Sequence, residues 1–291
     1  MSDAPYRLIR PATRLTSVVF ASPHSGRAYP ASFLARSVLD KRTIRTSEDA
    51  FVDELLRAAP LAGAPLLAAT APRAYLDLNR AADELDPALI ENVRLAAHNP
   101  RINSGLGVIP RVVAGGRAIY RGKLTLAEAM ERIDAVWRPY HERLAALLGE
   151  SQALFGEAIL IDVHSMPREA IDSMGGRGRR RPEIVLGDRF GVTAAPGIMD
   201  RIEAAFADEG LSVVRNTPFA GAYVAQTYGR PAASRHAIQV EIDRSLYMNE
   251  AEIRPHAGFA PFCRLMDRVI GRIAEIGRPE IGRPEIGLAA E

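Results

Sequence analysis

The sequence predicts an α/β protein built on a mixed, mostly parallel sheet with helices on both faces. Short apolar runs typical of strands alternate along the chain with longer segments whose apolar residues recur every three or four positions. One run, at 158–161, is apolar at every position, as expected for a strand that is buried on both faces in the middle of such a sheet.

The composition is that of an ordinary globular protein with one large core. The 291 residues are 47% hydrophobic and 25% charged, so we expect a single α/β domain over residues 1–274. The 37 Lys and Arg residues nearly balance 35 Asp and Glu residues, which argues against a nucleic-acid partner. The single cysteine, Cys263, cannot form an internal disulfide, and we assign it to the core.

Neither a membrane segment nor a targeting segment is expected. The apolar runs fall short of the roughly 18 residues that a membrane helix needs, and the N-terminus lacks the apolar stretch of a signal peptide. A cytoplasmic location is the resulting prediction. At the other end, residues 275–291 repeat Glu-Ile-Gly-Arg-Pro, and the glycines and prolines predict a low-complexity tail outside the domain.

The individual elements follow from local patterns. Apolar runs bounded by turn residues predict a hairpin between residues 107 and 120 and strands at 17–20, 65–69, 158–161, 183–187, 211–214 and 236–244. Periodic apolar positions predict helices at 47–56, 125–147, 199–209 and 259–273.

The helix at 125–147 has the clearest signals. Thr125 and Glu128 form a capping-box pattern at its start, and Pro139 is expected to kink it. His141 falls off the apolar stripe of this helix, so we predict a structural or exposed place for it.

Two histidines follow predicted strands. His24 lies in the turn Ser-Pro-His-Ser-Gly after the strand at 17–20, and His164 ends the strand that begins at 158. Ligands of α/β sheets collect at the carboxyl ends of strands, so both side chains are candidates for a functional site. The alternative is that local hydrogen bonds occupy each histidine.

Acidic residues come close to these positions in the predicted structure. Ser47 is expected to cap a helix whose first turn contains Glu48 and Asp49, which either interact with the helix dipole or take part in a site. Glu241 and Asp243 share one face of the strand at 236–244. A carboxylate in apolar surroundings has a raised pKa, which suits a general base.

Arginines form two further groups. The segment from Arg73 to Arg80 mixes alternating apolar residues with two arginines, and it predicts either a solvated strand edge or a grip on carboxylates. The glycine-rich basic segment 175–182 is either a solvated run of charge or a lid over an anionic substrate. Tyr223 and Tyr228 are expected in a loop.

Taken together, five motifs resemble the N-formylglutamate amidohydrolase family over residues 15–270. They are SPHSG at 22–26, SEDAFVDELL at 47–56, YLDLNR at 75–80, IDVHSMP at 161–167 and QVEIDRSLYM at 239–248. The resemblance implies a fold related to zinc carboxypeptidases and aspartoacylases, of the zinc exopeptidase or phosphorylase/hydrolase-like class. It also implies metal-dependent hydrolysis of N-formyl-L-glutamate to formate and glutamate in histidine degradation.

The resemblance assigns metal ligands to positions of this chain. His24 and His164 match the two metal histidines of the family. Carboxypeptidase relatives carry a glutamate three residues after the first histidine, but Arg27 stands there in this chain. The carboxylate ligand must therefore come from elsewhere, and Asp49 is preferred over Glu48.

The remaining site residues are assigned in the same way. Asn79 and Arg80 match residues that hold the substrate carboxylate, with Arg244 and Tyr228 as further substrate-binding candidates. Glu241 matches the catalytic glutamate. Arg73 is the candidate for the arginine that stabilises the oxyanion. Asp162 is the candidate for the residue that orients a metal ligand.

The chemistry is consistent with these residue types. Two neutral imidazoles and one carboxylate leave Zn²⁺, or another divalent ion, with a positive charge and an open position where water reaches a pKa near 7. Glu241 then accepts the proton of that water and passes it to the leaving nitrogen. Two alternatives remain: a zinc-dependent deacylase of another N-acyl amino acid, and a non-catalytic protein that binds acidic ligands.

Overall fold

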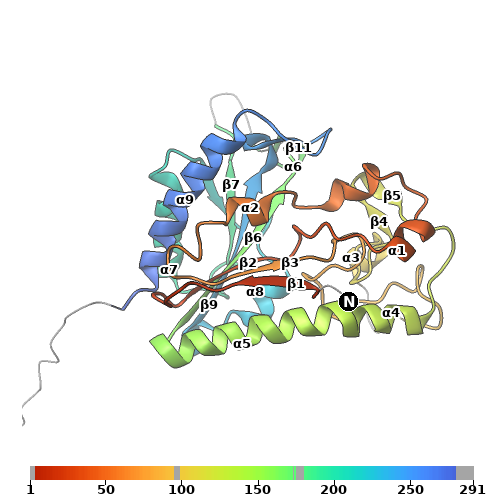
Figure 1. Ribbon diagram of the computed structural model, residues 1–291, viewed down its shortest axis with the longest axis horizontal. Helices are drawn as coiled ribbons and strands as arrows, with labels where there is room; N and C mark the ends of the chain where they lie inside the picture. The colour runs from red at the N-terminus through yellow and green to blue at the C-terminus, as the bar shows by residue number, and fades with distance from the viewer. Residues whose placement is uncertain (1–3, 95–98, 173, 175–179, 280–291) are drawn as a thin grey trace, which may run out of the picture.

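A seven-stranded mixed sheet forms the centre of the computed structural model, which describes residues 4–94, 99–172, 174 and 180–279 (Figure 1). The strand order is β1-β3-β2-β6-β9-β7-β8. The strands are β1 (Tyr6–Ile9), β2 (Val18–Ser22), β3 (Leu66–Ala69), β6 (Ala158–Met166), β7 (Ile184–Gly187), β8 (Val213–Arg215) and β9 (Arg235–Asp243).

The middle of the sheet is parallel. Strands β3, β2, β6 and β9 run in the same direction, whereas β1 is antiparallel to β3 and the pair β7 and β8 runs against β9. The carboxyl ends of β2, β6 and β9 therefore meet at one edge. The register of β6 on β9 places His164 opposite Glu241. The mixed, mostly parallel sheet of the sequence prediction is confirmed, and the edge strand β1 was not foreseen.

Helices cover both faces of the sheet (Figure 1). One face packs against α2 (Val52–Leu55), α7 (Pro196–Ala207) and α9 (Phe259–Ile276), and the buried Cys263 belongs to this core cluster, as predicted. The other face packs against α5 (Arg138–Phe155) and α8 (Tyr223–Tyr228). Because both faces are covered, the apolar positions of β6 are all buried.

The helix predicted at 125–147 is confirmed and is longer than expected. It starts as α4 (Leu126–Arg132) behind a capping box in which Thr125 and Glu128 each bond to the other's backbone. A π-helical turn, η3 (Ile133–Trp137), then leads into α5, so that Pro139 falls in the first turn of α5, where its missing N–H costs nothing.

Smaller elements surround the sheet. They comprise α1 (Ala31–Arg36), α3 (Pro100–Asn103), α6 (Glu169–Asp172), the two-stranded pairs β4 (Val112–Val113) with β5 (Arg117–Ala118) and β10 (Met248–Asn249) with β11 (Arg254–Pro255), and the short helices η1 (Thr43–Ser47), η2 (Ala114–Gly116), η4 (Pro231–Ala233) and η5 (Arg244–Leu246). The hairpin predicted between 107 and 120 is thus present as β4 and β5.

Two local predictions are wrong, and one alternative is excluded. Ser47 does not cap a helix, because it ends the 3-10 turn η1, and α2 begins only after Phe51, whose left-handed φ of 67° interrupts the chain. The segment expected as a loop around Tyr228 forms α8. Of the two interpretations left open for residues 73–80, the solvated strand edge is excluded, because the segment forms turns.

The end of the described chain also differs from expectation. Helix α9 continues to Ile276, and the carbonyl of Gly277 accepts a hydrogen bond from Ser17 N at 2.8 Å, so the packed body extends past residue 274. Residues 280–291 of the predicted tail lie outside the described residues, as do 175–179 of the basic segment. Of that segment, Arg180 pairs with Glu183 and Arg181 with Asp172.

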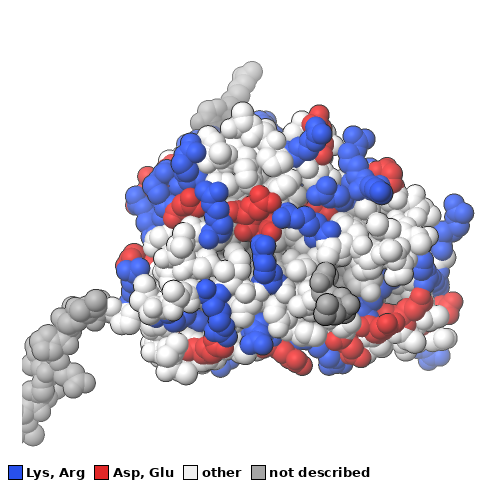
Figure 2. Space-filling view, viewed as in Figure 1, with Lys and Arg blue, Asp and Glu red and all other residues white. Residues whose placement is uncertain are grey.

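Charges of both signs are interspersed over the face of the molecule seen in Figure 2. This distribution agrees with the near-zero net charge of the sequence. Among the described residues, none of the helices combines the length and apolarity that a membrane crossing needs.

Candidate metal centre and active site

Three buried side chains converge at the carboxyl edge of the sheet. His24 follows β2, His164 lies near the end of β6, and Asp49 lies in the loop between η1 and α2. His164 Nδ1 is 3.1 Å from His24 Nδ1 and 3.0 Å from Asp49 Oδ2, and His24 Nδ1 is 3.4 Å from the same oxygen. All three side chains are at least 97% buried.

The backbone around His24 explains why these residues meet. A Cβ on Gly26 would lie 2.1 Å from the carbonyl oxygen of Ala71, so the turn after β2 can press against the segment after β3 only with glycine there. Asp49 N in turn donates to the carbonyl of His24 at 3.0 Å. This bond ties the loop that carries the carboxylate to the turn that carries the histidine.

A further carboxylate stands behind each histidine. His24 Nε2 donates to Asp77 Oδ1 at 2.8 Å, and His164 Nε2 donates to Asp162 Oδ2 at 3.0 Å. These bonds place the ring proton on Nε2 and direct the lone pair of Nδ1 inward, which is the arrangement that carboxylates behind metal-bound histidines produce. Asp162 therefore lies where the sequence predicted it, and Asp77 holds the equivalent position on His24.

The donor set fits a divalent cation. Three acceptor atoms face one another, and ligands at zinc distances around a tetrahedral centre stand about 3.3 Å apart, close to the separations found here. Although burial raises the pKa of Asp49, the close approach of His164 and His24 holds that pKa well below the usual range, so the carboxylate is charged. A cation at the centre would relieve the repulsion between the three acceptors.

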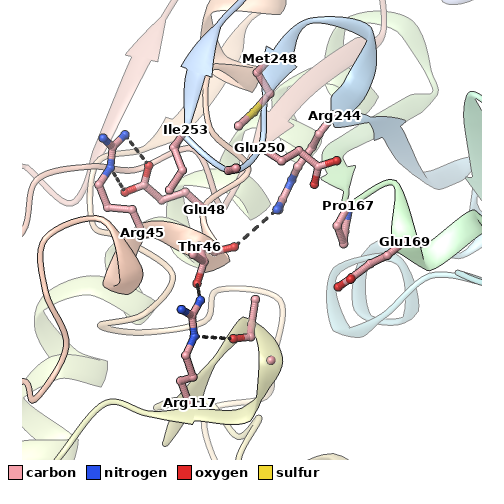
Figure 3. Close-up of a pocket in the computed structure, with 13 residues that line it drawn as sticks. Arg45, Thr46, Glu48, Arg117, Pro167, Glu169, Arg244, Met248, Glu250 and Ile253 are labelled. Atoms are coloured by element: carbon pink, nitrogen blue, oxygen red, sulfur yellow. Dashed lines mark hydrogen bonds and ion pairs between the residues drawn. The ribbon is translucent and has the colours of Figure 1, made fainter.

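Glu48 does not take part in this cluster. Its carboxylate binds the guanidinium of Arg45 through two bonds of 2.9 Å and accepts a 2.7 Å bond from the Tyr29 hydroxyl. Figure 3 shows Glu48 turned to Arg45 at the wall of a neighbouring pocket. Of the two acids that the sequence left as candidates, Asp49 alone reaches the histidines.

Glu241 faces the same cluster from β9. Burial raises its pKa to about 7, the positive charge of His164 opposes the shift, and the negative charge of Asp49 adds to it. Gln239, two residues earlier on the same face of β9, donates from Nε2 to Glu241 Oε1 at 2.9 Å. The Gln239 side chain therefore fixes the orientation of the carboxylate.

Asn79 connects Gln239 to the histidines. Its Nδ2 lies 3.2 Å from both Gln239 Oε1 and His164 Nε2, and its Oδ1 accepts a 2.8 Å bond from Val224 N at the start of α8. The Asn79 amide therefore holds Gln239 and the start of α8 in place beside His164.

A cavity of about 510 Å³ opens in front of the cluster. Its polar lining comprises His24, Asp49, Arg73, Asn79, Arg80, Arg101, His164, Ser165, Arg189, Gln239, Glu241 and Arg244. Eight of the ten site residues predicted from the sequence are among them. The two others are Asp162, which lies behind His164, and Tyr228.

The comparisons with known proteins bear on this site. The profile of the N-formylglutamate amidohydrolase family matches residues 16–248, which is most of the chain. This chain belongs to the N-formylglutamate amidohydrolase family. The match includes His24, Asp49, His164 and Glu241, the residues that the cavity brings together.

Individual relatives of the N-formylglutamate amidohydrolase family agree. The N-formylglutamate deformylase of Pseudomonas aeruginosa is 31% identical over 236 residues, covering 80% of this chain and 82% of the relative. That of Pseudomonas putida is 28% identical over 81% of this chain and 83% of its own length. The crystal structure of N-formylglutamate amidohydrolase from Ralstonia eutropha JMP134 has a TM-score of 0.88 at 38% identity, covering 94% of this chain and 98% of that one.

Within this family fold, Arg73 and Arg80 line the cavity in different ways. Arg73 Nε donates to Asp77 Oδ2 at 3.1 Å, which leaves the rest of its guanidinium in the cavity. Arg80 does not bond to Asp77. Its Nε and Nη1 donate to the carbonyls of Leu106 and Asn79, and it has no carboxylate partner among the described residues.

Arg244 lines the cavity and is bonded to two residues of the site. Its Nη2 donates to Asp49 Oδ1 at 3.0 Å and its Nε to Ser165 Oγ at 3.1 Å. Arg244 lines both this cavity and the neighbouring pocket of about 550 Å³. Figure 3 shows it reaching toward Thr46, whose carbonyl accepts its bond. Arg244 therefore holds the carboxylate of Asp49, and because it also lines the cavity, its binding of substrate stays a prediction.

The prediction for Tyr228 is corrected. Its hydroxyl lies 2.9 Å from His141 Nδ1, outside the cavity, because α8 turns the side chain toward α5. His141 itself is buried and bonded, which agrees with the structural role predicted for it.

Sequence reasoning missed several lining residues. Gln239 could have been found, since it precedes Glu241 by two positions on a predicted strand and therefore shares its face. Asp77 precedes Asn79 by the same interval. Arg101 and Arg189 come from α3 and from the loop after β7, where no local pattern signals a site.

Proposed function

We propose that this protein is a zinc-dependent amidohydrolase that cleaves N-formyl-L-glutamate to formate and L-glutamate. The observation that carries the proposal is the convergence of His24, His164 and Asp49 at separations of 3.0–3.4 Å beside Glu241. The names of the relatives supply the substrate. The cytoplasmic location and the role in histidine degradation inferred from the sequence are part of the same proposal.

The residues that would hold the metal are His24, His164 and Asp49, whose Nδ1 atoms and carboxylate face one another. Zn²⁺ in such a site acts as a Lewis acid that polarises a carbonyl oxygen and lowers the pKa of water toward neutrality. Asp77, Asp162 and Arg244 fix the rings and the carboxylate, so these ligands lose little freedom when the ion binds.

Proton transfer falls to Glu241. With a pKa of about 7, its carboxylate accepts a proton from the attacking water and returns it to the amide nitrogen as the C–N bond breaks. Gln239 keeps the accepting carboxylate in one orientation. Arg73 donates to the oxygen that gains negative charge when water adds to the formyl carbon.

A coupled measurement tests the proposal. Purified protein should contain about one zinc per chain and release formate from N-formylglutamate, and treatment with a chelator should stop the release until zinc is added back. Protein that stays active without metal would refute the zinc assignment. Faster turnover of N-acetylglutamate than of N-formylglutamate would favour the alternative of a deacylase with a larger acyl group.

A further inference from the structure

Three arginines on one side of the active-site cavity have no carboxylate partner among the described residues. Arg80 bonds only to two backbone carbonyls, Arg189 donates from Nη1 to the carbonyl of Gly221 at 3.2 Å, and the guanidinium of Arg101 has no hydrogen-bond partner there. Other buried or half-buried arginines of the described residues have other partners: Arg73, Arg111 and Arg244 pair with aspartates, and Arg132 and Arg143 bond to tyrosine hydroxyls. Arg80 is buried, Arg189 is half-buried and Arg101 is exposed, and all three line the active-site cavity.

Arg101 is placed beside Arg80 by a short chain of backbone bonds. Leu106 accepts from Arg80 Nε through its carbonyl and donates from its N–H to the carbonyl of Arg101. Asn99 caps α3 by accepting from Arg101 N at 3.0 Å. Both arginines line the active-site cavity and the adjoining cavity of about 710 Å³, so the two side chains lie at the same part of the wall.

Arg189 reaches the cavity from the opposite part of the chain. It adopts a left-handed φ of 53°, and the next residue, Phe190, has a φ of 59°. Asn216 holds this turn by accepting from Asp188 N and Phe190 N through Oδ1. Two such residues in succession are costly and tend to occur where function fixes a side chain.

Glycines let the loop that carries Arg189 fit closely against its neighbour. A Cβ on Gly187 would lie 2.6 Å from the carbonyl carbon of Ala220, and one on Gly221, whose φ is 103°, would lie 3.4 Å from Arg189 Cγ. The stem of Arg189 therefore packs against backbone, and its guanidinium is directed along a wall shared by two cavities.

We propose that Arg101 and Arg189 form a second carboxylate-binding position, which selects N-formyl amino acids that carry a carboxylate in the side chain. The inference rests on the proposed function. Asn79 Nδ2 lies 3.2 Å from His164 Nε2, and Arg80 is the next residue in the chain. Arg101 and Arg189 line both the active-site cavity and the adjoining cavity, which His164 and Glu241 do not line. The α-carboxylate, next to the scissile amide, is therefore assigned to Arg80, and the more distant side-chain carboxylate to Arg101 and Arg189.

The physical reason for selection is the pairing of charges. A guanidinium offers a planar pair of donors that match a carboxylate, and a neutral amide in the same place leaves one of them without an acceptor. A site built for a polar group discriminates strongly against an analogue that lacks it. N-formylglutamine, the neutral isostere, is accordingly expected to be a poor substrate.

The experiment compares kcat/KM for N-formylglutamate and N-formylglutamine in the metal-loaded enzyme. In Arg101→Gln and in Arg189→Gln, the ratio of the two values should fall about ten- to a hundredfold, mainly through the KM of the acidic substrate. Arg189→Lys should restore part of the ratio because it keeps the charge.

Arg230→Gln provides the matched control. Arg230 lines the adjoining cavity of about 710 Å³ together with Arg80, Arg101 and Arg189, but it does not line the active-site cavity. The same loss of one charge there should leave the ratio unchanged. If the ratio falls as far in Arg230→Gln as in the other two variants, the effect comes from the general positive potential of the cavity and not from direct contact, and the inference is overturned.

Two further outcomes are decisive. Equal losses on both substrates in Arg189→Gln, with a lower melting temperature, would assign Arg189 to bracing its loop and overturn its specificity role. If the unaltered enzyme hydrolyses neither formyl compound, the proposed function fails. In that case the arginine pair is tested by calorimetry, which compares the binding of glutarate with that of its monoamide. Tighter binding of glutarate that is lost in Arg101→Gln would support the inference. Equal binding of the two compounds by the unaltered protein would overturn it.

Discussion

Two buried histidine environments lie on either side of the segment from Asp77 to Arg80, and they differ in charge. His24 and His164 are surrounded by the carboxylates of Asp49, Asp77 and Asp162. His141 is bonded to the carbonyl of Leu78 and the hydroxyl of Tyr228, and it packs on Trp137 with ring centroids 4.1 Å apart.

The same residue type therefore acquires opposite properties. Although burial lowers the pKa of His164, the carboxylates of Asp162 and Asp49 raise it well above its ordinary value. Burial without a nearby carboxylate lowers the pKa of His141 to about 4. Carboxylates around a histidine prepare a place for a cation, and neutral partners make a histidine part of the scaffold.

The largest expected effect falls on the charged environment. Glu241→Gln should reduce kcat by roughly a thousandfold or more, because the amide cannot accept the proton of water, while zinc content stays at the level of the unaltered enzyme. Asp243→Asn is the control on the same strand. The Asp243 carboxylate accepts a hydrogen bond from Ser245 N and does not line the cavity. A loss below tenfold in Glu241→Gln would remove Glu241 from proton transfer.

A smaller effect is expected from Arg80→Lys, which keeps the charge but loses the planar donor pair. Substrate binding should weaken by about 2–3 kcal/mol, which corresponds to a rise in KM of about thirty- to a hundredfold or somewhat more. N-formylglutamate and N-formylmethionine should lose alike, because both have an α-carboxylate. N-formyl-4-aminobutyrate, which has none, should be spared; an equal loss on that compound would show that Arg80 acts on the fold.

Asp162→Asn tests the carboxylate behind His164. Removing its charge should weaken zinc affinity by roughly ten- to a hundredfold, measured by competition with a chelator. Asp86→Asn is the matched control, because Asp86 is equally buried but pairs with Arg111 and not with a histidine. Equal affinities in the Asp162 variant and the unaltered protein would contradict the metal assignment at His164.

The smallest effect is expected from the neutral environment and concerns stability. The pKa of His141 is about 4 in the folded state against an ordinary value of 6.5, so the unfolded chain takes up the proton first as the pH falls. Stability is complete above pH 6.5 and declines between 6.5 and 4. Between pH 7 and pH 5 the loss should be about 2 kcal/mol.

Urea unfolding at the two pH values measures this loss, and His141→Gln removes the titrating group. The decline in the variant should be smaller by that amount, with other groups contributing equally to both proteins. If the free energy of unfolding declines equally in the variant and the unaltered protein, His141 is protonated in the folded protein. The two histidine environments would then not differ as described.

The sequence predicted the sheet and the meeting of the two histidines because both depend on local patterns, whereas their role as metal ligands was assigned through the family resemblance. His24 and His164 end apolar strands, and parallel strands bring their carboxyl ends to one edge, so their meeting follows from the sequence alone. Asp49 was found only through the resemblance, since its loop has no regular structure. Arg101 and Arg189 could not be predicted, because their approach depends on how α3 and the loop after β7 pack.

Tyr228 illustrates the opposite failure. The segment around Tyr223 and Tyr228 was predicted to be a loop. In the structure, the side chain of Asn79 accepts a hydrogen bond from Val224 N, and this long-range bond helps to start α8. Tertiary contacts thus override the local preference, and the tyrosine hydroxyl turns to His141.

The pairing of β6 with β9 constrains how this chain can change over evolutionary time. His164 and Glu241 lie opposite each other in a ladder of nine paired residues. Inserting or deleting one residue inside either strand would send the following side chains to the other face of the sheet and separate the two groups. Length variation among functional descendants should therefore collect in connecting loops, and both strands should keep their length even where their apolar residues are exchanged.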